Sequence, residues 1–155
     1  MSALSSLSRP VNASRDLVLL VARVGLGVIF IAHGWQKFKT NGLDGTTAGF
    51  TNMGIPQPQI SAYFATFVEL VGGAALIVGA LTTLFGLLLT VNMAGAFLFV
   101  HRENGVFAAD GGWELVAALG LLSLTLAVVG AGKFSLDGLF RSAPNRSMTM
   151  ADARN

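Results

Sequence analysis

The sequence contains no cysteine among its 155 residues. This absence excludes disulfide bonds, CxxC redox motifs, thiolate metal sites and covalent attachment of c-type haem. Charged residues are also scarce, at 12% of the chain, whereas a soluble domain carries about 25%. The 10 basic and 8 acidic residues cannot coat a globular surface of this size, which argues against a soluble enzyme, a disordered chain and a nucleic-acid-binding protein.

What the sequence has instead is apolar length, with 53% hydrophobic residues and a mean hydropathy of +0.66. A membrane span needs about 20 apolar residues, so the chain has room for one membrane domain and little else. We expect an all-α fold, a four-helix transmembrane bundle of residues 17–140, between a mobile N-terminal tail (1–16) and a polar C-terminal tail (141–155). The predicted spans are about 17–35, 60–80, 84–100 and 113–131.

Two loops and one turn separate these spans. Residues 36–59 are rich in Gly, Thr and Asn and end in a Pro-containing segment, which predicts a loop with a short interfacial helix at Thr46–Met53. Residues 60–100 carry a single charge, Glu69, and would form a helix of roughly 60 Å, about twice the hydrocarbon thickness. This segment must fold back once, and we expect the turn around Gly79–Thr83.

The distribution of basic residues predicts the orientation. An even number of spans puts both termini on one side of the membrane, and the cytoplasmic side is richer in Lys and Arg. Both termini are therefore expected in the cytoplasm. Six basic residues lie on the terminal side (Arg9, Arg15, Lys133, Arg141, Arg146 and Arg154), and three lie in the opposite loops (Lys37, Lys39 and Arg102).

Two charged residues fall inside predicted spans, Arg23 in the first and Glu69 in the second. Each costs about 2.5–3.5 kcal/mol to insert and is retained with a partner or a function. Counted from the span ends, their depths differ by only about 7 Å. The simplest interpretation is an intramembrane Arg23–Glu69 ion pair that joins the first two spans. The functional alternative is that one of them binds a quinone head group, a lipid head group or a proton.

Small residues recur at helical spacing. Arg23, Gly27, Phe30, Gly34 and Lys37 follow one another at intervals of 4, 3, 4 and 3, which places them on one helix face. The glycines predict a shallow groove for another helix or for a ligand tail. Further residues expected to support helix packing are Gly72 and Gly73 in the second span and Asn92, whose amide can hydrogen-bond between helices.

A candidate ligand or partner site is expected at the outer end of the bundle, from His33, Lys37, His101 and Glu114. Histidine can bind a metal or donate to a quinone carbonyl, and a carboxylate can take a proton. The alternative is that these are interfacial residues reaching water. A quinone is a candidate cofactor, whereas two histidines alone are a weak signal for axial haem ligation. No metal site is predicted, and Gly25-Leu26-Gly27 is not a dinucleotide-binding fingerprint.

The order and spacing of several motifs resemble the DoxX family of bacterial inner-membrane proteins, over roughly Arg15 to Leu139. The closing motif departs from the family at Ala131, where a proline is common. The matching motifs are Arg23-x3-Gly27-x2-Phe30-x3-Gly34-x2-Lys37, Phe50-x2-Met53-Gly54-Ile55-Pro56, Glu69 with Gly72, Gly73 and Gly79, and Gly130-Ala131-Gly132-Lys133-Phe134-Ser135-Leu136-Asp137.

The resemblance implies a four-helix protein of the inner membrane, linked in some members to quinone-dependent oxidoreductases and in others to oxidative-stress complexes with soluble redox enzymes. Catalytic residues are not agreed for the family, so whether the chain is an enzyme stays open. We expect a non-catalytic or accessory subunit that recruits a soluble or peripheral oxidoreductase. A quinone or quinol site and homo-oligomerisation are left open. The rival hypothesis is a small oligomeric transporter or lipid-handling protein that uses Glu69, Asn92 and Glu114.

Overall fold

The computed structural model describes residues 3–141, with side chains described for residues 13–140, and this part of the chain is helical without any strand. The all-α class is therefore confirmed. The main helices are α1 (Ala3–Trp35), α2 (Gly42–Asn52), α3 (Pro58–Val78), α4 (Thr82–Ala96), α5 (Glu114–Val129) and α6 (Leu136–Arg141); π-helical turns at Gln36–Thr40 and Phe97–His101 extend α1 and α4, and short 3₁₀ helices lie at Arg102–Asn104 and Ala108–Asp110.

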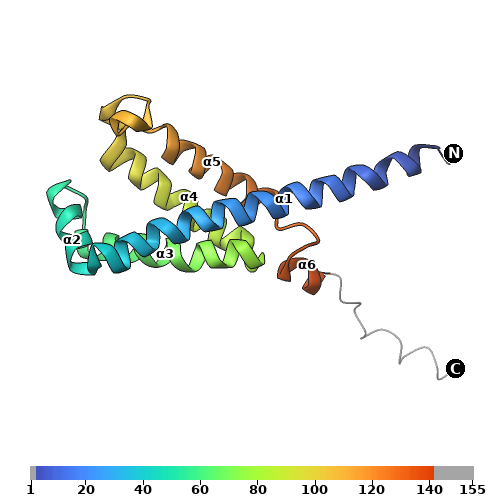
Figure 1. Cartoon of the computed structure of the whole chain (residues 1–155), viewed down its shortest axis with the longest axis horizontal. Coiled ribbons are helices and arrows are strands. Elements are labelled where there is room, and N and C mark those ends of the chain that lie inside the picture. Colours follow the sequence, from blue (N-terminus) through green and yellow to red (C-terminus); the bar gives the residue numbers. More distant parts are fainter. Residues whose placement is uncertain (1–2, 142–155) are drawn as a thin grey trace, which may run out of the picture.

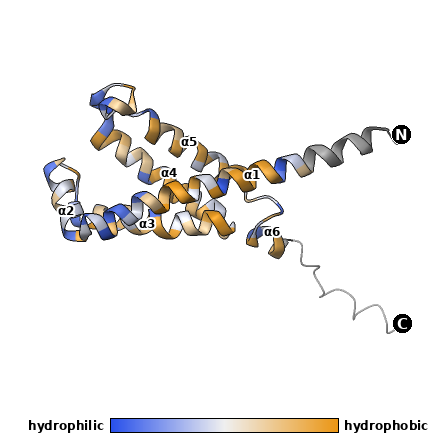
Figure 2. Ribbon diagram, in the orientation of Figure 1, coloured by the Kyte–Doolittle hydropathy of each residue, from blue (hydrophilic) through white to orange (hydrophobic). Residues whose placement is uncertain are grey.

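Three helical segments are long and apolar enough to cross a membrane: Ala13–Thr40, Pro58–Val78 and Thr82–Asn104. Helix α5 is equally apolar but has only 16 residues, about 24 Å, against a hydrocarbon core of about 30 Å. Figure 2 shows hydrophobic residues along the long helices and hydrophilic ones gathered at α2 and in the loop between α4 and α5. The chain is a helical membrane protein, while a fourth complete span stays a prediction.

The helices form two antiparallel pairs. Helix α1 packs along α3, and α4 packs along α5, while α2 covers one end of α3. Figure 1 shows the two pairs meeting near α6 and diverging toward α2 and the loop between α4 and α5. The buried core follows the pairs, with Leu26, Phe30, Leu76, Leu89 and Leu126 almost fully enclosed.

The turn between the second and third spans lies where the sequence predicts it. Helix α3 ends at Val78, and Gly79 follows with φ +68°, a left-handed conformation that glycine adopts at low cost. Leu81 has φ +49°, which is unusual for a residue with a branched side chain. The Asp137 carboxylate holds this turn by accepting the N–H groups of Leu81 at 2.8 Å and Thr82 at 2.9 Å.

The first and last helices of the described chain extend into the segments expected as tails. Helix α1 begins at Ala3, inside the segment predicted as a tail, and Asp16 is buried, its carboxylate accepting the Lys133 N–H at 3.2 Å. The predicted interfacial helix at Thr46–Met53 is longer, since α2 begins at Gly42. Of the predicted C-terminal tail, Arg141 ends α6, and residues 142–155 lie outside the described residues.

Candidate functional site: a cavity between the two helix pairs

A cavity of about 570 Å³ lies between the helix pairs, with lining residues from the segment that follows α2 and from the connection between α4 and α5. Most of its walls are apolar, and the segment from α2 to Pro56 closes part of it. Its polar lining residues are His33, Lys37, Ser61, Glu69, Asn92 and His101, and its larger apolar ones are Phe30, Phe50, Met53, Ile55, Pro56, Phe64, Val91, Met93, Phe99, Val100, Leu115, Val116 and Leu119.

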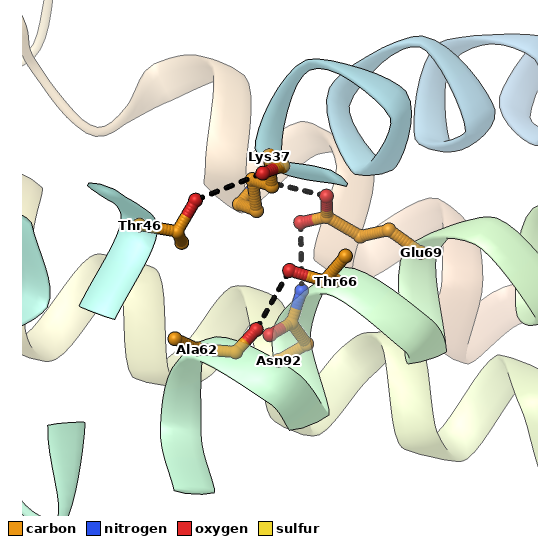
Figure 3. Close-up of polar contacts among 6 residues, drawn as sticks. All are labelled: Lys37, Thr46, Ala62, Thr66, Glu69 and Asn92. Carbon is orange, nitrogen blue, oxygen red and sulfur yellow. Dashed lines mark hydrogen bonds and ion pairs between the residues drawn. The ribbon is translucent and has the colours of Figure 1, made fainter. Parts of the chain in front are cut away.

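The Glu69 cluster, formed by Lys37, Glu69 and Asn92, is the charged centre of this cavity. Glu69 has a side chain only 3% exposed, and each of its carboxylate oxygens accepts one hydrogen bond. Lys37 Nζ donates to Oε2 at 2.7 Å, and Asn92 Nδ2 donates to Oε1 at 3.0 Å. Figure 3 shows the three side chains converging from separate helical segments. The cluster therefore links α1, α3 and α4 around one buried carboxylate.

Local backbone geometry positions Lys37. It lies in the π-helical turn Gln36–Thr40 that extends α1, and its backbone carbonyl accepts the hydroxyl of Thr46 on α2 at 3.0 Å. A second π-helical turn, Phe97–His101, ends α4 and carries His101. Single π-helical turns are rare in proteins, and those that occur often lie at functional sites. Here each of the two supplies a polar residue to the same cavity.

His101 joins the cavity to the 105–114 loop, which leads from the 3₁₀ turn at Arg102–Asn104 into α5 and ends at the first residue of α5, Glu114. Its Nδ1 lies 2.6 Å from the carbonyl oxygen of Gly111. Because a carbonyl can only accept, Nδ1 carries the hydrogen of this bond. Glu114 belongs to the same loop, and its carboxylate accepts the Ala108 N–H at 2.8 Å. Glu114 stabilises the loop and does not line the cavity.

The predicted outer site is thus assembled in part. The structure brings His33, Lys37 and His101 to one cavity and leaves Glu114 beside it. It adds Glu69 and Asn92, which the sequence placed in separate roles. The lining by residues 50–56 was not predicted either, although this segment stands among the motifs noted in the sequence.

Arg23 and Glu69 are not brought together, so the expected ion pair is replaced by two separate arrangements. The Arg23 side chain is fully buried at the other end of α3, in what we call the Arg23 network. Its Nη1 donates to the carbonyls of Leu76 at 2.9 Å and Ile77 at 3.2 Å, and its Nη2 donates to the carbonyl of Phe134. The guanidinium therefore satisfies carbonyls at the end of α3, as basic side chains near helix C-termini do.

The physical reason for this correction is the register between α1 and α3, which glycine contacts fix. A Cβ atom on Gly27 would lie 2.5 Å from the carbonyl oxygen of Gly73, and one on Gly34 would lie 2.9 Å from the Leu70 nitrogen. The backbones touch at these points, so Arg23 faces the end of α3 and Lys37 faces Glu69. Lys37 lies on the same face of the first span as Arg23. This shared face is the sequence feature that makes Lys37 an alternative partner for Glu69.

The remaining packing residues also contact neighbouring helices. Gly73 meets α1 at Gly27 and Ile31, whereas Gly72 faces Leu89 and Phe85, two residues of α4. Adjacent glycines on α3 thus allow close contact with two different helices, α1 and α4. Asn92 on α4 donates a hydrogen bond to Glu69 on α3.

This arrangement defines a class of protein: a helical membrane protein with a largely apolar internal cavity and a buried, fully paired carboxylate. The DoxX family matches residues 18–102, and the chain belongs to that family.

Relatives from several bacteria agree with this assignment. The chain is 32% identical over 126 residues to a Bacillus subtilis protein named "Putative oxidoreductase CatD", covering 81% of this chain and 89% of that one. It is 29% identical over 132 residues to the inner membrane protein YphA of Escherichia coli, covering 81% and 92%. It is also 29% identical over 146 residues to the membrane protein Rv3486 of Mycobacterium tuberculosis, covering 88% and 89%. No solved structure shows a significant match.

Proposed function

We propose that the chain is an accessory subunit of a redox system in the bacterial inner membrane, which binds a quinone or quinol in its cavity and recruits a soluble or peripheral oxidoreductase. The observation that carries this proposal is the cavity, because it combines apolar walls with a polar cluster at membrane depth. Its volume of about 570 Å³ lies within the range of roughly 300–1,000 Å³ that is typical of small-molecule sites.

The walls suit an aromatic head group with an apolar tail. Phe64 and Phe99 line the cavity and offer aromatic surface for a ring. The side chains of Phe64, Phe99 and Leu115 also have exposed surface, at 38%, 48% and 45%. On a membrane protein, such apolar surface contacts lipid tails, so a ligand dissolved in the bilayer could enter sideways between the helix pairs.

Charge balance favours a neutral ligand. Lys37 and Glu69 neutralise each other at 2.7 Å, and Asn92 satisfies the second carboxylate oxygen. An anionic head group would bring an uncompensated charge into a region of low dielectric constant, which is costly. A neutral head group can instead accept a hydrogen bond from the Lys37 ammonium, which donates one of its three N–H groups to Glu69.

The redox association rests on the family and on the name of one relative, CatD. With no cysteine, the chain cannot supply thiol chemistry, so a redox partner would have to contribute any such step. The inner-membrane location is supported by the relative YphA.

The test is ligand binding by the intact protein. We expect protein purified in a mild detergent to retain a quinone, identified by its absorption spectrum and mass spectrometry. After delipidation, it should bind a decyl-chain benzoquinone with a Kd that Glu69→Gln and Lys37→Met each raise about tenfold. Gln36→Ala is the matched control, since Gln36 shares the π-helical turn of Lys37 but is exposed and does not line the cavity. Wild-type protein without retained quinone or probe binding would overturn the proposal.

A lipid-handling or transport function is the second candidate. Glu69 and Asn92 line a cavity with exposed apolar residues at its rim, as such a pathway would require, whereas Glu114 does not line it. Under this hypothesis, proteoliposomes should transport a fluorescent phospholipid or a small solute, and Glu69→Gln should abolish the flux while the protein stays folded. Binding of the benzoquinone probe without flux would favour the accessory role.

A further inference from the structure

We propose that His101 makes the cavity select the hydroxyl-bearing, reduced form of its ligand over the form that carries only carbonyls. This inference rests on the proposed function and adds a residue that determines specificity. Its basis is the asymmetric use of the two ring nitrogens, one of which is committed to the protein backbone while the other is left for a ligand.

The bond from Nδ1 to Gly111 fixes the ring. The acceptor belongs to a loop held by its own backbone bonds: the Gly112 N–H to the Phe107 carbonyl at 2.8 Å, Trp113 to Gly105 at 3.1 Å, and Glu114 to Val106 at 3.0 Å. The Gly111 carbonyl also accepts a bond from Asn104 Nδ2 at 3.3 Å. A carbonyl held so firmly orients the imidazole and keeps the hydrogen of the neutral ring on Nδ1.

The other nitrogen, Nε2, has no protein partner among the described residues, and His101 lines the cavity. In the neutral ring with its hydrogen on Nδ1, Nε2 can only accept a hydrogen bond. A hydroxyl group can donate to it, whereas a carbonyl oxygen would face it lone pair to lone pair. An unpaired acceptor in a site of low polarity is unfavourable, so the hydroxyl form binds more tightly.

Two other polar side chains of the cavity are already engaged within the protein. Both Glu69 carboxylate oxygens accept bonds, from Lys37 and Asn92, and the Ser61 hydroxyl donates to the Pro56 carbonyl at 2.7 Å. The remaining ones do not distinguish a hydroxyl from a carbonyl. Lys37 donates equally well to a hydroxyl oxygen and to a carbonyl oxygen. The amide of Asn92 offers both a donor and an acceptor. His33 lines the same cavity but is exposed and has no hydrogen bond among the described residues that would fix its tautomer. His101 is the ring whose hydrogen position the fold determines.

The experiment uses two substitutions that separate the two nitrogens. In His101→Asn, the amide nitrogen takes the place of Nδ1, so the bond to Gly111 is kept and the acceptor at the Nε2 position is lost. In His101→Gln, the amide reaches the Nε2 position with an acceptor oxygen, and the bond to Gly111 is lost. Gln36→Ala is the matched control, since Gln36 is exposed and does not line the cavity.

The measurement is the Kd of a decyl-chain benzoquinone and of its hydroquinone, taken in detergent under anaerobic conditions. We expect wild-type protein to bind the hydroquinone about five- to tenfold more tightly, which corresponds to one hydrogen bond. His101→Asn should bind both forms equally with an unchanged unfolding temperature. His101→Gln should keep the preference with a lower unfolding temperature, and Gln36→Ala should keep it as well.

Two results would overturn the inference: equal affinity of wild-type protein for the two forms, or a preference that survives in His101→Asn. Either result leaves the proposed function in place, because a ligand still binds. If neither form binds, the proposed quinone or quinol site fails, and the role of His101 fails with it.

Discussion

At the scale of single residues, the two charged side chains in the predicted spans, Arg23 and Glu69, are stabilised by different kinds of partner. Arg23 is surrounded by backbone carbonyls, so it neutralises partial charges at the end of α3 and at Phe134. Glu69 is paired with the full charge of Lys37. The first arrangement is part of the fold, whereas the second faces a cavity and has hydrogen-bonding capacity left for a ligand.

Replacing Arg23 by Met should destabilise the protein by about 3 kcal/mol or more, because each carbonyl left unpaired in an apolar environment costs about 1–3 kcal/mol. Arg23→Lys should give an intermediate loss, since an ammonium cannot reproduce the fork of the guanidinium. The measurement is thermal unfolding in detergent. Arg15→Met is the control on the same helix, where the exposed side chain should matter little. Equal effects at positions 15 and 23 would contradict the role of the network.

Lys37 and Glu69 should respond unequally to substitution. Lys37→Met leaves a carboxylate that is 3% exposed without its counter-charge, and breaking a buried pair in this way costs about 3–5 kcal/mol. Glu69→Gln leaves an ammonium that is 22% exposed and can still reach water, so the loss should be nearer 1 kcal/mol. Unfolding temperatures of the two variants test this order. A larger loss for Glu69→Gln would show that the carboxylate, and not the pairing, stabilises the helices.

At the scale of elements, the contact between α1 and α3 decides which charges meet. Both helices, their apolar faces and the turn after α3 can be predicted from the sequence, because they follow from periodicity and from Gly79. The axial register cannot be predicted by counting residues from the ends of each span, since loops leave those ends undefined by several residues. The close approach of Gly27 and Gly73 sets the register, and it leads Arg23 and Glu69 to different partners.

Gly27→Ala should therefore separate α1 from α3 and lower stability by about 1–3 kcal/mol, the usual cost of overpacking. The added Cβ would lie 2.5 Å from the Gly73 carbonyl oxygen and 2.6 Å from Ile77 Cγ1. Gly25→Ala is the matched control two residues away, where a Cβ meets nothing within 4 Å. Its higher helix propensity should leave stability unchanged or slightly raised. Thermal unfolding of both variants tests the contact, and equal effects would argue against it.

The closing segment shows a further limit of sequence reasoning. The last predicted span ends near residue 131, and no pattern in Gly130–Asp137 indicates that this segment supports the turn between α3 and α4. In the fold, the Asp137 carboxylate caps α4, the Asp137 N–H donates to the Gly79 carbonyl at 2.9 Å, and Phe134 accepts from Arg23. These contacts join positions more than 50 residues apart, and helical periodicity carries no information at that distance.

At the scale of the whole molecule, the two helix pairs meet near α6 and diverge toward α2 and the loop between α4 and α5 (Figure 1). The Arg23 network lies at the end of α3 that precedes α4, and the cavity lies toward α2. The closed end is held by hydrogen bonds among α1, α3 and the closing segment. At the diverging end, the segment that follows α2 and the 105–114 loop cover part of the cavity. One end is thus fixed by backbone contacts, while the other offers space for a ligand.

Orientation can be tested cleanly because the natural chain has no cysteine. In intact cells, Ala109→Cys should react with a membrane-impermeant maleimide, since Ala109 is exposed in the loop between α4 and α5. Ser147→Cys should react only after the membrane is opened, as both termini are predicted in the cytoplasm. The unsubstituted protein gives the background. Labelling of position 147 from outside would reverse the orientation or remove α5 as a span.

The Arg23 network also sets an order of assembly during synthesis. Arg23 leaves the ribosome 53 residues before Leu76 and 111 residues before Phe134. At about 5–20 residues per second, the first helix exists for roughly 6–20 s before its last partner has been made. Its guanidinium must meanwhile be accommodated by the insertion machinery or by lipid head groups. The closing segment therefore completes the bonding of the first helix, and a chain interrupted before position 134 would lack the carbonyl that accepts the bond from Arg23 Nη2.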